Sequence, residues 1–268
     1  MLFRHFQPSE ALAPYIRSYW MLEHDIVSDT PEIILPDGCA EMVFHYGDRY
    51  VSHIAGQRLV QSQTVIVGQI RQAITLQALG RTGIFAIRFH PWGLYAFTGI
   101  PMQQLTELAV DAESIWGKEL ALVREQVYHA ATDDKVKVME RFLLGILRKQ
   151  HRSVTNKANF ISSVLQPLQH HKGNIPVAHL AYHAHTSVRN FNRMVTETTG
   201  IAPKLLARIT RLQSFLNIHT PGNTLTDSLY KCGYYDQAHF IREFKEIAGT
   251  TPNRFFSDDN RMAELMLQ

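Results

Sequence analysis

The sequence predicts an α+β protein, with a β-barrel or sandwich-like domain and trailing helices over residues 1–150 and an all-α domain over residues 157–256. Short runs rich in β-branched and aromatic residues, broken by Pro and Gly, fill residues 1–90. From residue 91 onward, apolar residues recur at helical spacing. Charge divides the chain in the same way. Residues 1–150 hold 14 Lys and Arg against 16 Asp and Glu, a net −2, whereas residues 151–256 hold 12 against 5, a net +7.

Composition excludes several classes of protein. A chain of 268 residues with 45% hydrophobic content is long enough for one or two domains with real cores. No apolar run approaches the ~18 residues that cross a membrane, and the N-terminus lacks the features of a signal peptide. Cys39 and Cys232 are too few for a disulfide framework or a four-Cys zinc site. We therefore expect a cytoplasmic protein that does not contact a membrane.

Six strands are expected in the first domain, over residues 15–22, 41–46, 50–55, 63–67, 73–79 and 83–89. In the last of these, Ile84, Ala86 and Arg88 alternate with Phe85, Ile87 and Phe89, as in a strand with two different faces. Half a dozen strands at this spacing predict a small barrel or sandwich.

Helices are expected over residues 92–97 and 102–108, followed by an antiparallel pair over 112–129 and 134–150. The last of these is strongly amphipathic, with a stripe made of Val136, Met139, Phe142, Leu143, Ile146 and Leu147. This exposed-looking stripe predicts either a homodimer contact or docking on the C-terminal domain. Residues 151–156 are expected to be a polar linker, and residues 157–171 the lead helix of the second domain.

The C-terminal region contains one pattern twice, 49 residues apart. The pattern has an N-cap, two apolar stripe residues, an outward arginine, a glycine stop and a proline: Ser187/Asp236, Phe191/Phe240, Val195/Phe244, Arg193/Arg242, Gly200/Gly249 and Pro203/Pro252. A short helix precedes each copy, and a connecting helix over 203–218, with about 14 residues, would be ~20 Å long. Two helix-turn-helix units held apart in this way suit successive major-groove turns, roughly 34 Å apart. The alternative is a pair of helical hairpins whose polar faces are merely solvated.

The second copy reads CGYYDQAHFIREFKEIAGTTPNRFF. It resembles the DNA-binding domain of AraC/XylS-type transcriptional regulators, and the first copy, SVRNFNRMV…TGIAPK, resembles it more loosely. Together they cover about residues 157–256. Two departures are His185, where the turn of the first unit often has Gly, and Ser228-Leu229, where an Ile-Ala pair usually packs under the recognition helix. The Ser228 hydroxyl is expected to bond a carbonyl one turn back.

The resemblance implies a sequence-specific regulator that binds double-stranded DNA, contacts RNA polymerase and more often activates than represses. It implies no enzyme activity and no cofactor, and the sequence contains no nucleophile elbow, P-loop or dinucleotide loop. Carried over by position, the base-contacting residues are Arg189, Asn192, Arg193, Gln237, Ala238, His239 and Arg242. Arginine pairs with guanine, Asn and Gln pair with adenine, and an Ala methyl suits thymine.

Phosphate contacts are implied for Ser187, Lys204 and Arg211; such contacts position a protein without specifying a sequence. The alternative for Arg242 is an ion pair with Glu246 at i+4.

The first half contains APYIRSYW, LPDGCAEMVFHYGD and FAIRFHPWGLYAFTGIP. These stretches resemble the β-rich N-terminal sensor domain of a subgroup of AraC-type regulators. Such a domain would place a small-molecule effector among inward-facing side chains. The candidates are Trp20, Cys39, Glu41, His45, Arg88 and Trp92. The alternative gives the tryptophans and Cys39 to the core, and Glu41 and Arg88 to the surface or to a structural ion pair.

The sequence leaves room for a metal site and for a different function. His179 and His183 have the i, i+4 spacing that can chelate zinc, but no Glu follows His179 and no third ligand is placed, so no metal is expected. The rival function is a ligand-binding or enzymatic N-terminal domain with a vestigial helical tail. That protein would bind DNA only through counterion release, without sequence preference.

Overall fold

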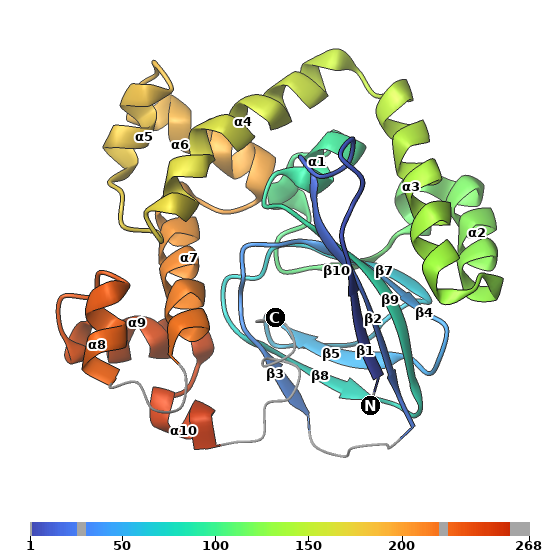
Figure 1. Cartoon of the computed structure of the whole chain (residues 1–268), viewed down its shortest axis with the longest axis horizontal. Helices are drawn as coiled ribbons and strands as arrows, with labels where there is room; N and C mark the ends of the chain where they lie inside the picture. Colours follow the sequence, from blue (N-terminus) through green and yellow to red (C-terminus); the bar gives the residue numbers. More distant parts are fainter. Residues whose placement is uncertain (1, 26–30, 220–224, 258–268) are drawn as a thin grey trace.

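Two antiparallel sheets pack face to face in the N-terminal half of the computed structural model, which describes residues 2–25, 31–219 and 225–257 (Figure 1). The larger sheet has the order β1-β2-β9-β4-β7-β10, with bounds Leu2–Phe6, Ile16–His24, Thr82–Phe89, Glu41–His45, Thr64–Val67 and Ala109–Asp111. The smaller has the order β3-β8-β5-β6, with bounds Glu32–Ile34, Ile74–Ala78, Tyr50–Ile54 and Gln57–Val60. All six expected strands are confirmed. The four others were missed because they are short or, like β6, exposed along their whole length.

The two faces of the larger sheet bury different cores, as the alternation along β9 predicts. Phe85, Ile87 and Phe89 lie in the core beneath the helices, and Ile84 and Ala86 lie in the core between the sheets. The same alternation operates along β4, because successive strand side chains point to opposite faces. The inner face of the larger sheet is therefore available to line a space between the sheets.

Three helices follow the sheets: α1 (Gly93–Thr98), α2 (Glu113–His129) and α3 (Thr132–Lys149). The helix expected over 102–108 is only the 3-10 turn η1 (Met102–Gln104). The exposed stripe expected on α3 is wrong, since Met139, Phe142 and Leu143 are buried in the core shared by α2, α3 and the larger sheet. The expectation failed because the sheet presents a second apolar face that needs covering.

The polar linker expected at 151–156 is also wrong, because α4 begins at Arg152 and runs to His170. His151 caps it, with Nδ1 accepting from the Ser153 amide at 3.2 Å. Val154 packs against the N-terminal core, and Tyr15 donates a hydrogen bond from its hydroxyl to Asn159 Oδ1 at 2.9 Å. A helix held by both halves therefore joins them (Figure 1).

The C-terminal half contains two helix pairs separated by α7 (Pro203–Ile218), as Figure 1 shows. The pairs are α5 (Val177–His183) with α6 (Val188–Thr199), and α8 (Leu225–Lys231) with α9 (Gln237–Ala248); α10 (Pro252–Ser257) follows. Both predicted N-caps are confirmed, with Ser187 accepting from the Asn190 amide at 3.2 Å and Asp236 from the His239 amide at 2.6 Å. Gly200 and Gly249 end α6 and α9 in the left-handed conformation.

The two departures from the family pattern are accommodated locally. His185 itself takes the left-handed conformation, with φ +49°. Ser228 is buried, and its hydroxyl bonds His219 Nδ1 at 3.3 Å instead of the expected carbonyl. In the turn between α8 and α9, glycine is required at position 233 for two reasons. Its φ is +72°, and an added Cβ would lie 2.2 Å from Asn174.

Within the three described ranges, no helix combines the length and apolar character that a membrane span needs.

Candidate functional site

The expected base-contacting residues lie on the outer faces of α6 and α9. Arg189, Arg193, Gln237, Ala238 and Arg242 are exposed, and Asn192 and His239 are half-buried. Their side chains share the polarity and reach that base edges require. Because α6 and α9 each have 12 residues and begin 49 positions apart, the two faces are presented at the same turn of each helix.

Arg193 and Arg242, at matched positions, differ in their surroundings. Arg193 donates to Asn190 Oδ1 at 2.9 Å and lies 3.5 Å from Glu197. The ion pair considered for Arg242 with Glu246 is not formed, because Glu246 instead bonds Arg208. Among the described contacts Arg242 therefore has no carboxylate of its own.

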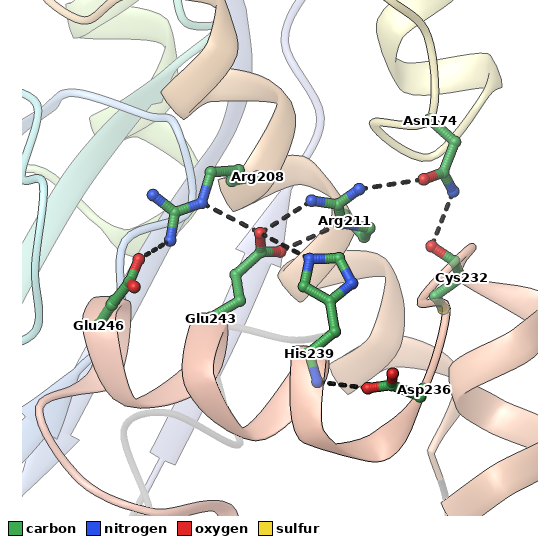
Figure 2. A network of polar contacts seen from close by, with 8 residues as sticks. All are labelled: Asn174, Arg208, Arg211, Cys232, Asp236, His239, Glu243 and Glu246. Atoms are coloured by element: carbon green, nitrogen blue, oxygen red, sulfur yellow. Dashed lines mark hydrogen bonds and ion pairs between the residues drawn. The ribbon is translucent and has the colours of Figure 1, made fainter.

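A buried carboxylate holds α9 against α7. Glu243 is only 5% exposed, and it accepts from Arg211 Nε at 3.1 Å, Arg211 Nη2 at 2.8 Å and Arg208 Nε at 3.0 Å (Figure 2). Helical spacing alone groups Glu243 with the polar residues on the outer face of α9, but the structure buries it. The face turned toward α7 is polar at this point because two α7 arginines meet it.

The same cluster reaches the first helix pair. Arg211 Nη1 donates to Asn174 Oδ1 at 3.2 Å, and Asn174 Nδ2 donates to the Cys232 carbonyl at 2.7 Å (Figure 2). Asn174 precedes α5, and Cys232 lies in the turn between α8 and α9. Arg211, also 5.1 Å from the Tyr234 ring, is therefore part of the joint between the two units, whereas the sequence suggested a free phosphate contact.

A groove runs between the two units along α7. Its basic residues outnumber its acids: Lys204, Arg208, Arg211, His239 and Arg242 stand against Glu243 and Glu246. Lys204 and Ser187, both expected at phosphates, are exposed. A groove of this sign attracts a polyanion.

A second site is the cavity between the two sheets, about 1000 Å³ when its open side is included. Its walls contain five of the six residues expected to meet a ligand: Trp20, Cys39, Glu41, His45 and Arg88. The sixth, Trp92, is elsewhere. It packs with the core of the first helix pair and donates from Nε1 to the Pro14 carbonyl at 2.9 Å. Trp92 lies at the start of α1, which faces α4, so it cannot point between the sheets.

One end of the cavity holds an ionic cluster. Arg88, with 9% of its side chain exposed, bonds Asp37, and its Nε lies 3.9 Å from Glu41 Oε1. Trp20 Nε1 donates to Glu41 at 3.2 Å. Burial raises the pKa of Glu41 to about 7, although the Arg88 charge opposes the shift. Burial likewise raises the pKa of the Cys39 thiol, to about 11. The ion pair considered in the sequence is present, and it is part of the cavity wall.

The other end is polar but uncharged. His45 Nε2 lies 2.9 Å from Gln61 Oε1, and burial lowers the pKa of His45 to about 4, so the ring is neutral at pH 7. The Tyr50 and Thr82 hydroxyls bond each other at 2.9 Å.

The C-terminal half closes part of the cavity, with Gln213 and Leu216 of α7 and Phe255 of α10 among its walls. Gln213 Nε2 donates to the Pro36 carbonyl at 2.7 Å, and the Ala73 amide donates to the Ile247 carbonyl of α9 at 2.7 Å. Sequence reasoning missed Asp37, Gln61 and Gln213. The Pro-Asp-Gly turn at 36–38 was read only as a strand break, and nothing local pairs Gln213 with a residue so distant in the chain.

His179 and His183 are both exposed, and the described part of the chain contains no group of three His, Cys, Asp or Glu residues placed to hold a metal ion.

Two family models match the chain. Residues 4–111 match a family described as a domain of unknown function (DUF6597), and residues 180–258 match a helix-turn-helix domain family. No curated protein matches the sequence.

Solved structures of ToxT from Vibrio cholerae share the fold. One crystal form is 11% identical, with a TM-score of 0.51 over 90% of this chain and 98% of that chain. ToxT of strain SCE256 with unsaturated fatty acid bound is 12% identical, with a TM-score of 0.51 over 90% and 95%. ToxT bound to (E)-4-(8-methylnaphthalen-1-yl)but-3-enoic acid is 11% identical, with a TM-score of 0.50 over 96% and 99%. At these identities the likeness establishes the fold alone.

The helix-turn-helix match begins within α5 and includes all of α6 and of the second helix pair; the caps, stops and exposed faces of α6 and α9 repeat at one offset. It also lies in the basic part of the chain, with the β-rich half ahead of it. The chain therefore combines a β-rich N-terminal domain with a C-terminal helix-turn-helix domain of the DNA-binding, AraC type.

Proposed function

We propose that this regulator reads two successive major-groove segments through α6 and α9, and that a small molecule in the cavity between the sheets controls the reading. The observation that carries the first part is the repeat of two 12-residue helices with matched caps and exposed polar faces. The α7 helix separates them, and its 16 residues span ~24 Å at 1.5 Å per residue. The joint at Glu243 supports reading as a unit, since it limits independent movement of the two helix pairs.

Base reading is assigned to Arg189, Asn192 and Arg193 on α6 and to Gln237, Ala238, His239 and Arg242 on α9. Ser187 and Lys204 are assigned to phosphates. A phosphate contact by Arg211 would first require exchange of its bonds to Glu243. A base contact by Arg193 would similarly replace its bonds to Asn190 and Glu197.

Control by a small molecule is supported by the place of the cavity. An occupant would touch the inner face of the sheets and, through Gln213, Leu216 and Phe255, the DNA-binding half. A ligand shifts an equilibrium only by its differential affinity for the two states. Contacts with both halves provide such a difference, because any movement of α7 and α10 away from the sheets would lose them. The ToxT complexes show that a protein of this fold takes apolar acids.

Activation through contact with RNA polymerase in the cytoplasm rests on the family resemblance. Transcription in vitro from a footprinted promoter tests it, and fewer transcripts on adding the regulator would make it a repressor.

Genomic footprinting of the full chain at physiological salt tests the DNA-reading proposal. Two protected segments about one helical turn apart are expected. The rival protein, with a vestigial helical tail, would bind without preference and would lose its DNA as salt rises.

Replacing Arg242 by Ala is expected to cost ~1–3 kcal/mol of binding to the footprinted site and to relax the preference at one base pair. Arg242 is exposed on the second turn of α9, on the face that carries Gln237 and Ala238. The measurement is a binding series over single-base variants of the site. Lys245→Ala, also exposed on α9, is the control. An equal loss on every DNA sequence would make Arg242 a phosphate contact.

A further inference from the structure

We propose that the cavity binds an elongated, mainly apolar molecule with a cationic, hydrogen-bond-donating head, and that the head lies beside Glu41. This inference rests on the proposed control by a small molecule and names the class of that molecule.

The length follows from β4. Glu41, Val43 and His45 occupy alternate positions on its inner face, and at ~3.3 Å per residue Glu41 and His45 are about 13 Å apart. Much of the remaining lining is apolar and comes from both sheets: Val43, Val67, Ile74, Leu76 and Ile84. An occupant that satisfies both ends is therefore longer than it is wide and has an apolar body.

The head follows from the charges at the Glu41 end. Two carboxyl groups, Asp37 and Glu41, share one guanidinium, Arg88. The nearby donors are turned toward these two carboxylates: Trp20 Nε1 donates to Glu41, Arg88 donates to Asp37, and Arg88 Nε lies 3.9 Å from Glu41 Oε1. An anionic head would add a third carboxylate to one arginine in a poorly solvated site, whereas a cation balances the charge.

The pKa of Glu41 supports the same polarity. It is raised to about 7 by burial even though Arg88 is close, so Arg88 offsets only part of the cost of burying the carboxylate charge. A bound cation would compensate it and favour the ionised carboxylate.

The His45 end of the cavity also favours a ligand with a hydrogen-bond donor. His45 is 3% exposed, and with Nε2–H donating to Gln61 Oε1 its Nδ1 carries a lone pair. No hydrogen-bond partner of Nδ1 is found among the described residues. Both ends therefore have spare acceptors, and a ligand with donors fits them.

The charged groups around Glu41 determine the pH dependence. Arg88 faces it from β9, and Asp37 and Cys39 face it from the segment before β4. Arg17 on β2 donates from Nη1 to Cys39 Sγ at 3.7 Å, and the charges of Arg17 and Arg88 both act on His5 of β1. Cys39 and His45, with pKa values of about 11 and about 4, stay uncharged between pH 6 and pH 8, and burial together with Arg88 and Arg17 lowers the pKa of His5. Glu41 is therefore the cavity group that titrates in this window, and its ionised form, which holds the cation, is lost as pH falls.

Calorimetric titration of the full chain with decylammonium, 1-decanol and decanoate, each below its micelle concentration, tests the proposal. Decylammonium is expected to bind most tightly and decanoate least. The affinity for decylammonium is expected to fall about tenfold between pH 8 and pH 6, because the ionised fraction of Glu41 drops from ~90% to ~10%. The affinity for 1-decanol should change little.

Glu41→Gln is expected to weaken decylammonium about tenfold or more and to abolish the pH effect. Glu119→Gln, an exposed acid on α2, is the control and should leave binding unchanged. If Glu41→Gln fails to fold, the pH series on the unaltered protein still decides the matter. Tighter binding of decanoate, no measurable binding of decylammonium, or its pH-independent binding would overturn the inference.

Footprinting of the same preparation separates this inference from the proposed function. Specific footprints without decylammonium binding overturn only the ligand class. Decylammonium binding without specific footprints overturns the DNA-reading proposal and leaves the ligand class standing.

Discussion

Replacing Glu243 by Ala is expected to destabilise the DNA-binding domain by about 3 kcal/mol or more, because removing one member of a buried ion-pair network leaves its partners uncompensated. Glu243 accepts from Arg208 and Arg211, which are 25% and 15% exposed. Both arginines can turn partly toward water, which favours the lower end of the usual range. Hydrogen exchange of α7 and α9 amides in the full chain measures the change.

Glu246→Ala is the matched control. Glu246 lies on the same helix and bonds the same Arg208, but it is 65% exposed, so its loss is expected to cost less than about 1 kcal/mol. Equal effects of the two substitutions would show that burial of Glu243 contributes nothing.

Glu243→Ala should also alter DNA binding. Without Glu243, the groove between the units gains one positive charge, and Arg208 and Arg211 become available to phosphates. Non-specific binding is expected to strengthen, with the salt slope steeper by about one for each new phosphate contact. The slope comes from titrations of random-sequence duplex DNA at several salt concentrations.

Phe240→Ala is expected to cost about 3–5 kcal/mol of unfolding free energy, the range for deleting a fully buried aromatic ring. Phe240 is 0% exposed. Its ring centroid lies 4.4 Å from that of Phe215, 5.1 Å from that of Tyr234 and 5.6 Å from that of Phe244. Because these rings come from α7, the turn and α9, the cavity left behind would loosen the support of the second recognition helix.

The measurement is chemical denaturation of the full chain together with footprinting of the second protected segment. Tyr230→Ala is the control, since Tyr230 is 65% exposed on α8 and surface changes usually stay within about ±0.5 kcal/mol. A stable Phe240→Ala protein that keeps both footprints would contradict the claim that this aromatic cluster supports the second recognition helix.

Much of the DNA-binding domain could be predicted from the sequence, because its signals are local. A helix start needs a residue such as Ser187 or Asp236 that can cap the next three amides, and a helix end needs a residue such as Gly249 that tolerates the left-handed conformation. The repeat made these signals reinforce one another. The two faces of β9 could also be predicted from the sequence, since residues two positions apart in a strand point to the same face.

Other features depended on which elements meet. Glu243 looks like a surface residue on the α9 helix alone, and only the approach of α7 makes it the centre of a joint. The α3 stripe looked exposed until the larger sheet covered it. Five cavity residues could be named from three sequence stretches, but Trp92 was wrongly included because the direction of α1 is set by packing on α4.

The sequence by itself determined the α+β class, the six central strands, and the two helix-turn-helix units with their caps. Only the tertiary structure decided that Glu243 joins the units, that Glu41 and His45 stand at opposite ends of one cavity, and that Gln213 closes it from the other half. The physical reason is range. Capping, periodicity and turn chemistry act over a few residues, whereas burial, pKa shifts and ion pairing depend on groups that folding brings together from distant parts of the chain.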